Sequence, residues 1–581
     1  MENYLATTGI SQIWDKDRSL LFLGPWCLTG KRAKEALGTR AYMLLPSPWK
    51  PAGKVKAAEE YCRSTYEALL PDLGAALNKA HALDYPDKYW RILLEPWLYH
   101  FVTVFYDRFK RMELAASLYP DFHTHVLQAE NCALACHDTH DFIDKASDDY
   151  YNLKIFSLVV RRLYPQNLIE SDFSASSEVK RVKISWKKKN LYGILNRILS
   201  RGRMVCAEMY HLDYFDMLRL KSLVGFSSLG FAEFITDGPA GAQNAHSMEL
   251  RSSIKVGAGC DRFSSLLNAI IPEAIPASYL ENYRVYKDAA AGFKINPRPA
   301  AVGSSIGWFF NEFFKFYAAE AAAGGAALLD FQHGGAGYGF SASMPMEKLS
   351  SHKDAFYSWG RDLPGKDNQR PLPSAHLSKL RNKYNRATNK ILFVGTEFPR
   401  YVYRFHNFLM PEDMPDYFAA QVCFFSALRA DLKKNILYRG YFDYGWAELP
   451  AARAACPGMR FVRKGRLTDR IKMAGVVVID HPHTAFLEAL VINAPCVFYW
   501  DHDVYLLRSE AEKYFDRLRQ AGILHKDPQS ASAKVNEIYD DPVAWWLDEA
   551  RQQARREFCD RYAYADKDWL NIWAKELGRF L

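Results

Sequence analysis

The residues best suited to chemistry in this chain lie in one short turn between an apolar run and a helical segment. The apolar run is Val476–Ile479. The turn that follows contains Asp480, His481, Pro482, His483 and Thr484. Ligands of open α/β sheets bind beyond the carboxyl ends of strands, and helix N-termini attract phosphate. The pattern therefore predicts a site for an anionic, nucleotide-bearing ligand, in which His481 or His483 neutralises a phosphate or donates a proton to it.

The segment after the turn carries apolar side chains at helical spacing. Thr484 stands where a first-turn hydroxyl can bond backbone N–H groups or a phosphate, and Glu488 follows one helical turn later. The same pair is close to a plain capping arrangement. A ligand-binding role and a structural role for Thr484 and Glu488 both stay open at this point.

A second polar segment, Phe331–Gly339 (FQHGGAGYG), also follows an apolar strand-like run. Its four glycines indicate unusual dihedral angles or a close approach of the backbone to a ligand, which points to Gly334 and Gly335. The loop presents His333. Neither the Walker nor the Rossmann glycine spacing is present. The alternative is a tight glycine turn with a hydrogen-bonded histidine.

Basic residues stand at two further strand ends of the C-terminal half. Arg439 ends the run ILYR, and Arg463 ends FVR. Arginine at such positions can bind phosphate through two parallel hydrogen bonds, although exposed arginines at strand ends are common.

A histidine- and cysteine-rich segment is the main candidate for a metal site. Its members are His123, His125, Cys132, Cys136, His137 and His140. Spacings of four residues make zinc conceivable, but the paired short spacings of familiar zinc sites are missing. The nearest approach to an Asp-x-Asp element is Asp501–His502–Asp503. We therefore expect no metal and no other cofactor.

Composition favours a folded α/β protein that is reduced and cytoplasmic. The 581 residues are 49% hydrophobic and 24% charged, and the ten cysteines are scattered. No signal peptide or uninterrupted apolar run of membrane-spanning length is found. The net charge is +9, and Lys180–Arg203 holds nine basic residues and no acidic one. This stretch could contact the inner face of an anionic membrane or an anionic acceptor, or it could be a solvated loop running into a helix. No nucleic-acid-binding motif accompanies it.

The order of expected elements indicates an α/β protein with a doubly wound sheet in its C-terminal half. From Lys390 onward, strands alternate with helical stretches, as in a doubly wound parallel sheet, whereas the first half is rich in helices. We predict a helix-rich α/β domain on the acceptor side over 1–360 and a linker over 361–388. A nucleotide-binding domain follows over 389–540, and C-terminal helices over 541–581 pack back towards the N-terminal domain.

Several segments carry a resemblance to a family of transferases encoded in bacterial surface-polysaccharide and nonulosonate gene clusters. They include LATTGISQIWDK, YWRILLEPWL, LDFQHGGAGYG, YRGYFDYGW and HTAFLEALVINAPCVFYW. The glycine-histidine loop and the HP–Thr–Glu block are also similar to two-domain (GT-B) sialyl- and Kdo-type glycosyltransferases and to polyol-phosphate transferases, which use CMP- or CDP-linked donors. The resemblance implies His481 and Thr484 beside the donor phosphate and Glu488 on the ribose. Ala485 departs from the relatives, which more often show two adjacent hydroxyl residues here.

The resemblance implies a GT-B-like α/β fold, with two Rossmann-like domains facing a cleft, and an inverting, metal-independent glycosyltransferase. It would move a sugar, such as Kdo or a sialic-acid-like nonulosonic acid, from a nucleotide donor to a surface-glycan, lipid-linked glycan or glycoprotein acceptor, as in lipopolysaccharide synthesis. His333 is the candidate catalytic base, with Asp141 and Glu95 as alternatives. Two other functions stay open: transfer of a polyol phosphate or other phosphoryl-linked group, and non-catalytic binding of glycan or membrane.

Overall fold

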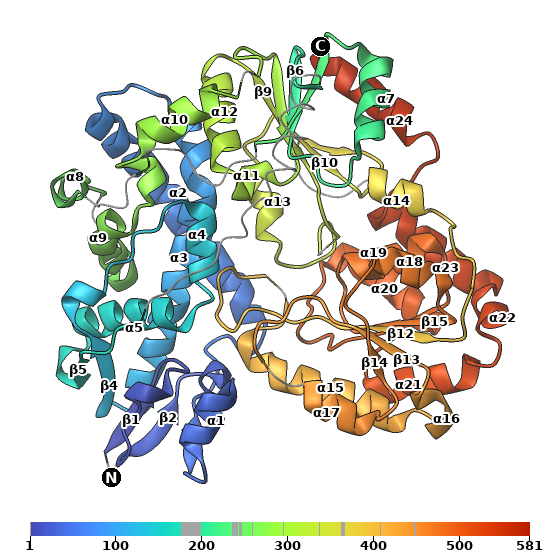
Figure 1. Cartoon of the computed structure of the whole chain (residues 1–581), viewed down its shortest axis with the longest axis horizontal. Coiled ribbons are helices and arrows are strands. Elements are labelled where there is room, and N and C mark those ends of the chain that lie inside the picture. Colours follow the sequence, from blue (N-terminus) through green and yellow to red (C-terminus); the bar gives the residue numbers. More distant parts are fainter. Residues whose placement is uncertain are drawn as a thin grey trace.

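The computed structural model describes residues 2–175, 199–234, 242, 247–257, 259–293, 295–335, 337–361, 367–406, 408–446 and 449–581. Within these residues the strands form three parallel sheets with helices packed on their faces (Figure 1). The predicted pair of Rossmann-like units is confirmed by the second and third sheets. The first sheet, at the N-terminus, was not predicted as a sheet, although the apolar run Leu20–Gly24 indicates its strand β2 (Ser19–Phe22).

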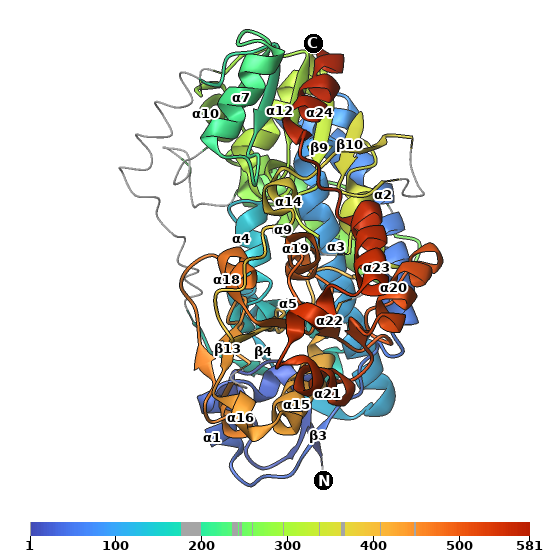
Figure 2. The same cartoon turned by 90° about the vertical axis from the view of Figure 1, so that its right-hand side faces the viewer.

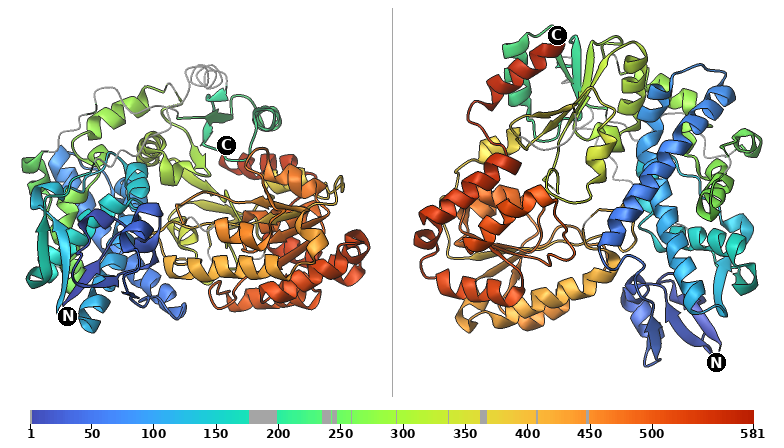
Figure 3. Two further views of the ribbon diagram at one scale, coloured as in Figure 1. Left: turned by 60° about the horizontal axis from the view of Figure 1, so that its bottom comes forward. Right: turned by 180° about the vertical axis from the view of Figure 1, so that it is seen from behind.

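The N-terminal sheet has five strands in the order β3-β2-β1-β4-β5. Its strands are β1 (Asn3–Ala6), β2 (Ser19–Phe22), β3 (Tyr42–Leu44), β4 (Phe122–Leu127) and β5 (Leu168–Ser171). Its helices are α1 (Lys31–Leu37), α2 (Gly53–His81), α3 (Asp87–Leu118), α4 (Thr139–Lys145) and α5 (Asp149–Leu163). Helix α3 is buried on nearly all sides, because it packs against helices of both this unit and the next, as the blue and cyan helices in Figure 3 illustrate.

The middle sheet has six strands in the order β11-β10-β9-β8-β6-β7. These are β6 (Met204–Ala207), β7 (Leu229–Ala232), β8 (Ala301–Ser304), β9 (Ala327–Phe331), β10 (Ala355–Ser358) and β11 (Gln369–Pro371). The helices of this part of the chain are α7 (Tyr214–Val224), α8 (Met248–Ser253), α9 (Arg262–Ala274), α10 (Tyr283–Ala291), α11 (Gly307–Phe310), α12 (Glu312–Ala323), α13 (Pro345–Leu349) and α14 (Ala375–Leu380). One face of the sheet shares a continuous apolar core with α2 and α3. The first two sheets are thus packed as one body.

The C-terminal sheet follows the Rossmann strand order, β14-β13-β12-β15-β16-β17. Its strands are β12 (Ile391–Val394), β13 (Ile436–Arg439), β14 (Arg460–Phe461), β15 (Val476–Ile479), β16 (Cys496–Tyr499) and β17 (Leu524–His525). Strand β15 (VVVI) is buried along its whole length, as expected for a central parallel strand covered on both faces. Strand order reverses between β12 and β15, and ligands of such sheets bind at this switch point.

Helices cover both faces of the C-terminal sheet. They are α15 (Met414–Ala427), α16 (Ala430–Lys433), α17 (Leu449–Ala455), α18 (Leu467–Met473), α19 (Thr484–Ile492), α20 (Ser509–Gln520), α21 (Pro528–Ile538), α22 (Pro542–Trp546) and α23 (Glu549–Tyr562). The last helix, α24 (Trp569–Leu577), leaves this unit and lies beside α7 on the middle sheet (Figure 2). There the ring of Trp573 stacks on Phe331, with 5.3 Å between centroids.

The predicted domain boundaries stay a prediction. The structure adds that the stretch 361–388, expected as a linker, contains β11 at the edge of the middle sheet and α14. None of the helices in the described residues is both long and apolar enough to cross a membrane.

Candidate functional site

The glycine loop and the polar turn, which follow strands of different sheets, meet directly. The Gly335 N–H donates a hydrogen bond of 2.9 Å to Thr484 Oγ1. A Cβ atom at position 335 would lie 2.6 Å from Leu487 Cδ1 and 3.1 Å from Thr484 Cα, so any larger residue would require the Leu487 side chain and the Thr484 backbone to shift. The carboxyl ends of β9 and β15 therefore face each other across this contact, and Thr484 opens helix α19 at the same point.

Asp480 positions the turn. Its carboxylate accepts hydrogen bonds from Tyr417 Oη at 2.9 Å and from Gln421 Nε2 at 2.8 Å. His481 Nδ1 lies 2.9 Å from Asp480 Oδ1. A carboxylate partner at Nδ1 fixes the orientation of an imidazole and leaves Nε2 for another partner. The buried Asp480 thus orders both the strand end and His481.

Arg404 is the main site residue that the sequence did not reveal. Its guanidinium has no hydrogen bond or ion pair to any residue that the structure describes, and its Nε is buried. It lies over the ring of Tyr403, with 4.9 Å from Cζ to the centroid. It follows no strand and no motif, so spacing gave no signal for it. A half-buried guanidinium whose Nε has no partner marks a place suited to an anion.

Three histidines lie close to Arg404, from the glycine loop, the polar turn and its own loop. Burial, with a smaller contribution from the charge of Arg404, lowers the pKa of His333 to about 4. Burial, His481 and Arg404 hold the pKa of His483 well below its usual value. Burial and Arg404 do the same for His406. The Nε2 atoms of His406 and His483 are buried, with no partner among the described residues. The cluster is therefore neutral imidazoles around one cation.

Glu488 is engaged in a pair that the sequence did not predict. Its Oε1 lies 2.6 Å from Nε2 of His376, on α14. His376 stacks on His211, with 4.2 Å between centroids, and His211 Nε2 lies 3.1 Å from the carbonyl oxygen of His333. Polar side chains of α14 and α19 thus link the glycine loop to the C-terminal sheet. The predicted contact of Glu488 with ribose stays a prediction.

The other predicted donor-binding residues lie at the edge of the C-terminal sheet. Arg439 donates to the carbonyl oxygens of Val462 at 3.0 Å and Gly465 at 3.3 Å, so it fastens the loop after β14. Arg463 is exposed in that loop. The structure brings together Gly334, Gly335, His333, His483 and Thr484. It leaves both arginines outside this group.

The two alternative carboxylates are engaged elsewhere. Asp141, in the first turn of α4, accepts from the N–H of His137 at 2.8 Å and from Lys145 Nζ at 3.0 Å. Glu95 is buried on α3, where Arg91 lies 3.2 Å and His352 3.1 Å from its oxygens. Burial raises the pKa of Glu95 to about 7. Their predicted catalytic role stays a prediction.

The histidine- and cysteine-rich segment is divided between strand β4 and the loops and helix after it. All ten cysteines are free thiols. Among the described residues, no group of three or more histidine, cysteine, aspartate or glutamate side chains could hold a metal ion. Asp501 accepts a hydrogen bond of 2.8 Å from the N–H of Asp503, as in an ordinary turn. The basic stretch Lys180–Arg203 lies, up to residue 198, outside the described residues.

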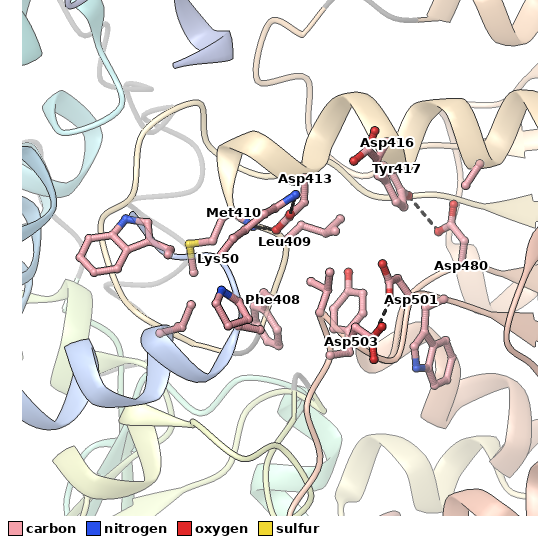
Figure 4. Close-up of a pocket in the computed structure, with 18 of the residues that line it drawn as sticks. Lys50, Phe408, Leu409, Met410, Asp413, Asp416, Tyr417, Asp480, Asp501 and Asp503 are labelled. Atoms are coloured by element: carbon pink, nitrogen blue, oxygen red, sulfur yellow. Dashed lines mark hydrogen bonds and ion pairs between the residues drawn. The ribbon is translucent and has the colours of Figure 1, made fainter. Parts of the chain in front are cut away.

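A cavity of about 440 Å³ lies next to the polar turn, and Asp480 forms part of its wall (Figure 4). It is bounded by residues 47–55, by the start of α15 and by the ends of β15 and β16. Phe408 lines it, and the same ring packs edge-on against His483, with 4.5 Å between centroids. The cavity and the Arg404 cluster are therefore neighbours.

Comparison with known proteins adds a family and a set of loose likenesses. A family model described as "LIC12162 family transferase" matches residues 3–577. Among solved structures, MurG of Acinetobacter baumannii is 11% identical, over 65% of this chain and 99% of that chain, with a TM-score of 0.33. Anabaena Alr3699/HepE, in complex with UDP and glucose, is 10% identical over 65% and 99%, with a TM-score of 0.35. Likenesses this loose assign no residue and no reaction. The sequence matches no curated protein.

Proposed function

We propose that this chain, which belongs to the LIC12162 family of transferases, is a glycosyltransferase of the inverting, metal-independent GT-B type. It would move a sugar, such as Kdo or a sialic-acid-like nonulosonic acid, from a CMP-type nucleotide donor to a surface-glycan, lipid-linked glycan or glycoprotein acceptor. The observation that carries this proposal is the hydrogen bond from Gly335 to Thr484, with the unpaired Arg404 beside it. It supports a phosphate site where two Rossmann-like sheets meet.

The donor phosphate would lie between the N-terminus of α19 and the guanidinium of Arg404. Free N–H groups at a helix N-terminus and an arginine both stabilise an anion, and the arginine can do so through two hydrogen bonds. His481, His483, Gly334 and Gly335 would contact the same phosphate. The negative charge that develops on the leaving phosphate would then be stabilised by groups already in place.

The base that activates the acceptor hydroxyl would be His333. Because its pKa is about 4, its imidazole is neutral near pH 7 and can accept a proton. The acceptor oxygen would attack the anomeric carbon as the bond to the phosphate breaks, and His333 would take the hydroxyl proton. Asp141 and Glu95 stay the alternatives for this step. Glu488 would bind the ribose only if its contact with His376 broke and the ligand took the place of His376.

Cytoplasmic location and contact of Lys180–Arg203 with an anionic membrane remain part of the proposal. Transfer of a polyol phosphate would use the same phosphate site. The two reactions differ in their products, because phosphorus would then appear in the acceptor. A non-catalytic binding protein would bind no nucleotide.

A thermal-shift screen with CMP, CDP, UDP, GDP and dTDP tests the proposal. A ligand that binds only the folded state increases the free energy of unfolding by about 2.7 kcal/mol at a hundredfold excess over Kd, and so raises the melting temperature. We expect at least one nucleotide to do so. Thr484→Val should weaken this response, whereas Thr484→Ser, which keeps the hydroxyl oxygen, should preserve it. No response to any of the five at millimolar concentration would overturn the proposal.

A further inference from the structure

The cavity beside the polar turn has the size and rigidity of a binding site. Its volume of about 440 Å³ falls within the range of about 300–1,000 Å³ that is typical of small-molecule pockets. Its walls come from distant parts of the chain and are held in place. Trp49 donates a hydrogen bond of 2.7 Å from Nε1 to Asp107, and Tyr417 is bonded to Asp480. The cavity is thus preformed.

Two tyrosines that line this cavity have buried hydroxyls without a partner among the described residues. Tyr499 and Tyr505 line the cavity and are each only 3% exposed. Their hydroxyl oxygens are buried without a hydrogen bond to any residue that the structure describes. Both lie close to Asp480, whose charge adds to burial in raising the pKa of each phenol. Buried hydroxyls are normally satisfied, so these two indicate a ligand that carries hydrogen-bonding groups.

The charge of the lining excludes anionic ligands. Six carboxyl groups line the cavity, namely those of Asp413, Asp416, Asp480, Asp501, Asp503 and Asp527, against two amines, Lys50 and Lys526. Lys50 is paired with Asp413 at 3.1 Å. In Figure 4, Lys50 and Asp413 lie on one side of the cavity, with Asp480, Asp501 and Asp503 on the other. The field is the opposite of that around Arg404, so the two neighbouring sites select different ligands.

Aromatic rings form much of the remaining wall. They belong to Trp49, Phe408, Tyr417, Tyr499, Trp500 and Tyr505. Flat apolar rings pack against the C–H faces of a sugar ring, while carboxylates and phenol oxygens accept hydrogen bonds from its hydroxyl groups. A sugar residue fits this combination, and a phosphate or carboxylate on it would not.

We propose that this cavity binds a sugar residue without negative charge, as a subsite for the acceptor glycan. The acceptor role rests on the proposed function, because Phe408 and Tyr505, which line the cavity, both pack against His483. The sugar-binding role rests on the lining itself. It can be tested without any transfer reaction.

The test is a thermal-shift titration of the full chain with glucose, galactose, mannose, glucosamine and N-acetylglucosamine, and with glucose 6-phosphate as the anionic probe. At least one of the five sugars should raise the melting temperature, and glucose 6-phosphate should not. Tyr499→Phe and Tyr505→Phe should each weaken sugar binding by about fivefold, the value of one hydrogen bond. Neither change should harm folding, because each removes a hydroxyl that has no partner.

Tyr562→Phe is the matched control. Its hydroxyl is also buried without a partner, but Tyr562 does not line the cavity, so its sugar response should equal that of the parent protein. The inference is wrong if no sugar responds, if glucose 6-phosphate binds as well as glucose, or if both cavity variants respond like the parent. Nucleotide binding is scored separately. Loss of one response with the other intact shows which of the two proposals fails.

Discussion

Arg404 allows the phosphate site to be located by a single substitution. Arg404→Gln should weaken binding of the responding nucleotide by about 10- to 100-fold, because a hydrogen bond to a charged group contributes about 1.5–3 kcal/mol. The fold should persist, since the guanidinium has no hydrogen bond or ion pair to the described residues. Isothermal titration calorimetry measures the affinity directly.

Arg463→Gln is the comparison, because the sequence predicts Arg463 as a donor ligand and the structure exposes it in the loop after β14. An exposed charge contributes about 0–1 kcal/mol, so its loss should change affinity only a few-fold. If Arg463→Gln weakens binding strongly and Arg404→Gln does not, the phosphate lies at the β14 edge of the sheet. The assignment to Arg404 would then be wrong.

Among single residues, the sequence is informative where a motif couples residue type to a strand end. Thr484 and Gly335 could be chosen in this way, and they touch. Arg404 could not be chosen in this way, because it lies in a loop without periodicity. Its place in the site depends on His333 and His483, which come from other segments of the chain. Partners such as His376 for Glu488 are likewise set by tertiary packing, which spacing does not encode.

At the scale of elements, the close approach of the glycine loop to α19 makes a steric prediction. Gly335→Ala should destabilise the protein by about 1–3 kcal/mol, because its Cβ would lie 2.6 Å from Leu487 Cδ1 and 3.1 Å from Thr484 Cα. It should also lower nucleotide affinity, since the two loops must separate. Urea unfolding and nucleotide titration measure the two effects.

Gly334→Ala is the adjacent control. Its Cβ would meet only Thr484 Oγ1, at 3.4 Å, which is an ordinary contact. The change should therefore cost much less stability than Gly335→Ala. Equal losses for the two variants would mean that the loop does not hold this contact in solution.

Strands were predictable where both faces of a sheet are covered. β15 (VVVI) and β9 (ALLDF) read as apolar runs, and both are buried and located as expected. In the N-terminal sheet only β2 (SLLF) reads as an apolar run, and the sheet as a whole was missed because its other strands are short or mixed in polarity. β3 (YML) is exposed, and β4 (FHTHVL) alternates with histidines. Its strands are also interrupted by long helices, which dominate the pattern of the first half.

For the whole molecule, buried histidines gather where the three sheets and their helices meet. His100, on α3, stacks on Tyr403, and His352 contacts Glu95 across two units. The charge of Arg404 acts on His333, His406 and His483. Every one of these has a lowered pKa, chiefly through burial. The neutral imidazoles belong to the contacts that hold the units together.

This arrangement predicts loss of stability in mild acid. A histidine whose folded pKa lies below its unfolded value of about 6.5 contributes stability that is present above that value and is lost as the pH falls towards the folded pKa. For His100, with a folded pKa of about 4, the loss over this window is about 3 kcal/mol. Carboxyls with raised pKa, such as Glu95 at about 7 and Asp330 at about 6, act in the opposite direction, but among the described residues they are fewer than the histidines with lowered pKa.

Calorimetric melting between pH 7 and pH 4.5 measures this effect. The melting temperature should fall steadily on acidification, and His100→Gln should reduce the slope even if it lowers stability at pH 7, because that residue no longer takes up a proton on unfolding. His525→Gln, which alters a histidine of the C-terminal sheet outside these contacts, should change the slope less. A melting temperature that stays constant or rises towards pH 4.5 would contradict the prediction. It would mean that the carboxyl groups with raised pKa outweigh the histidines with lowered pKa.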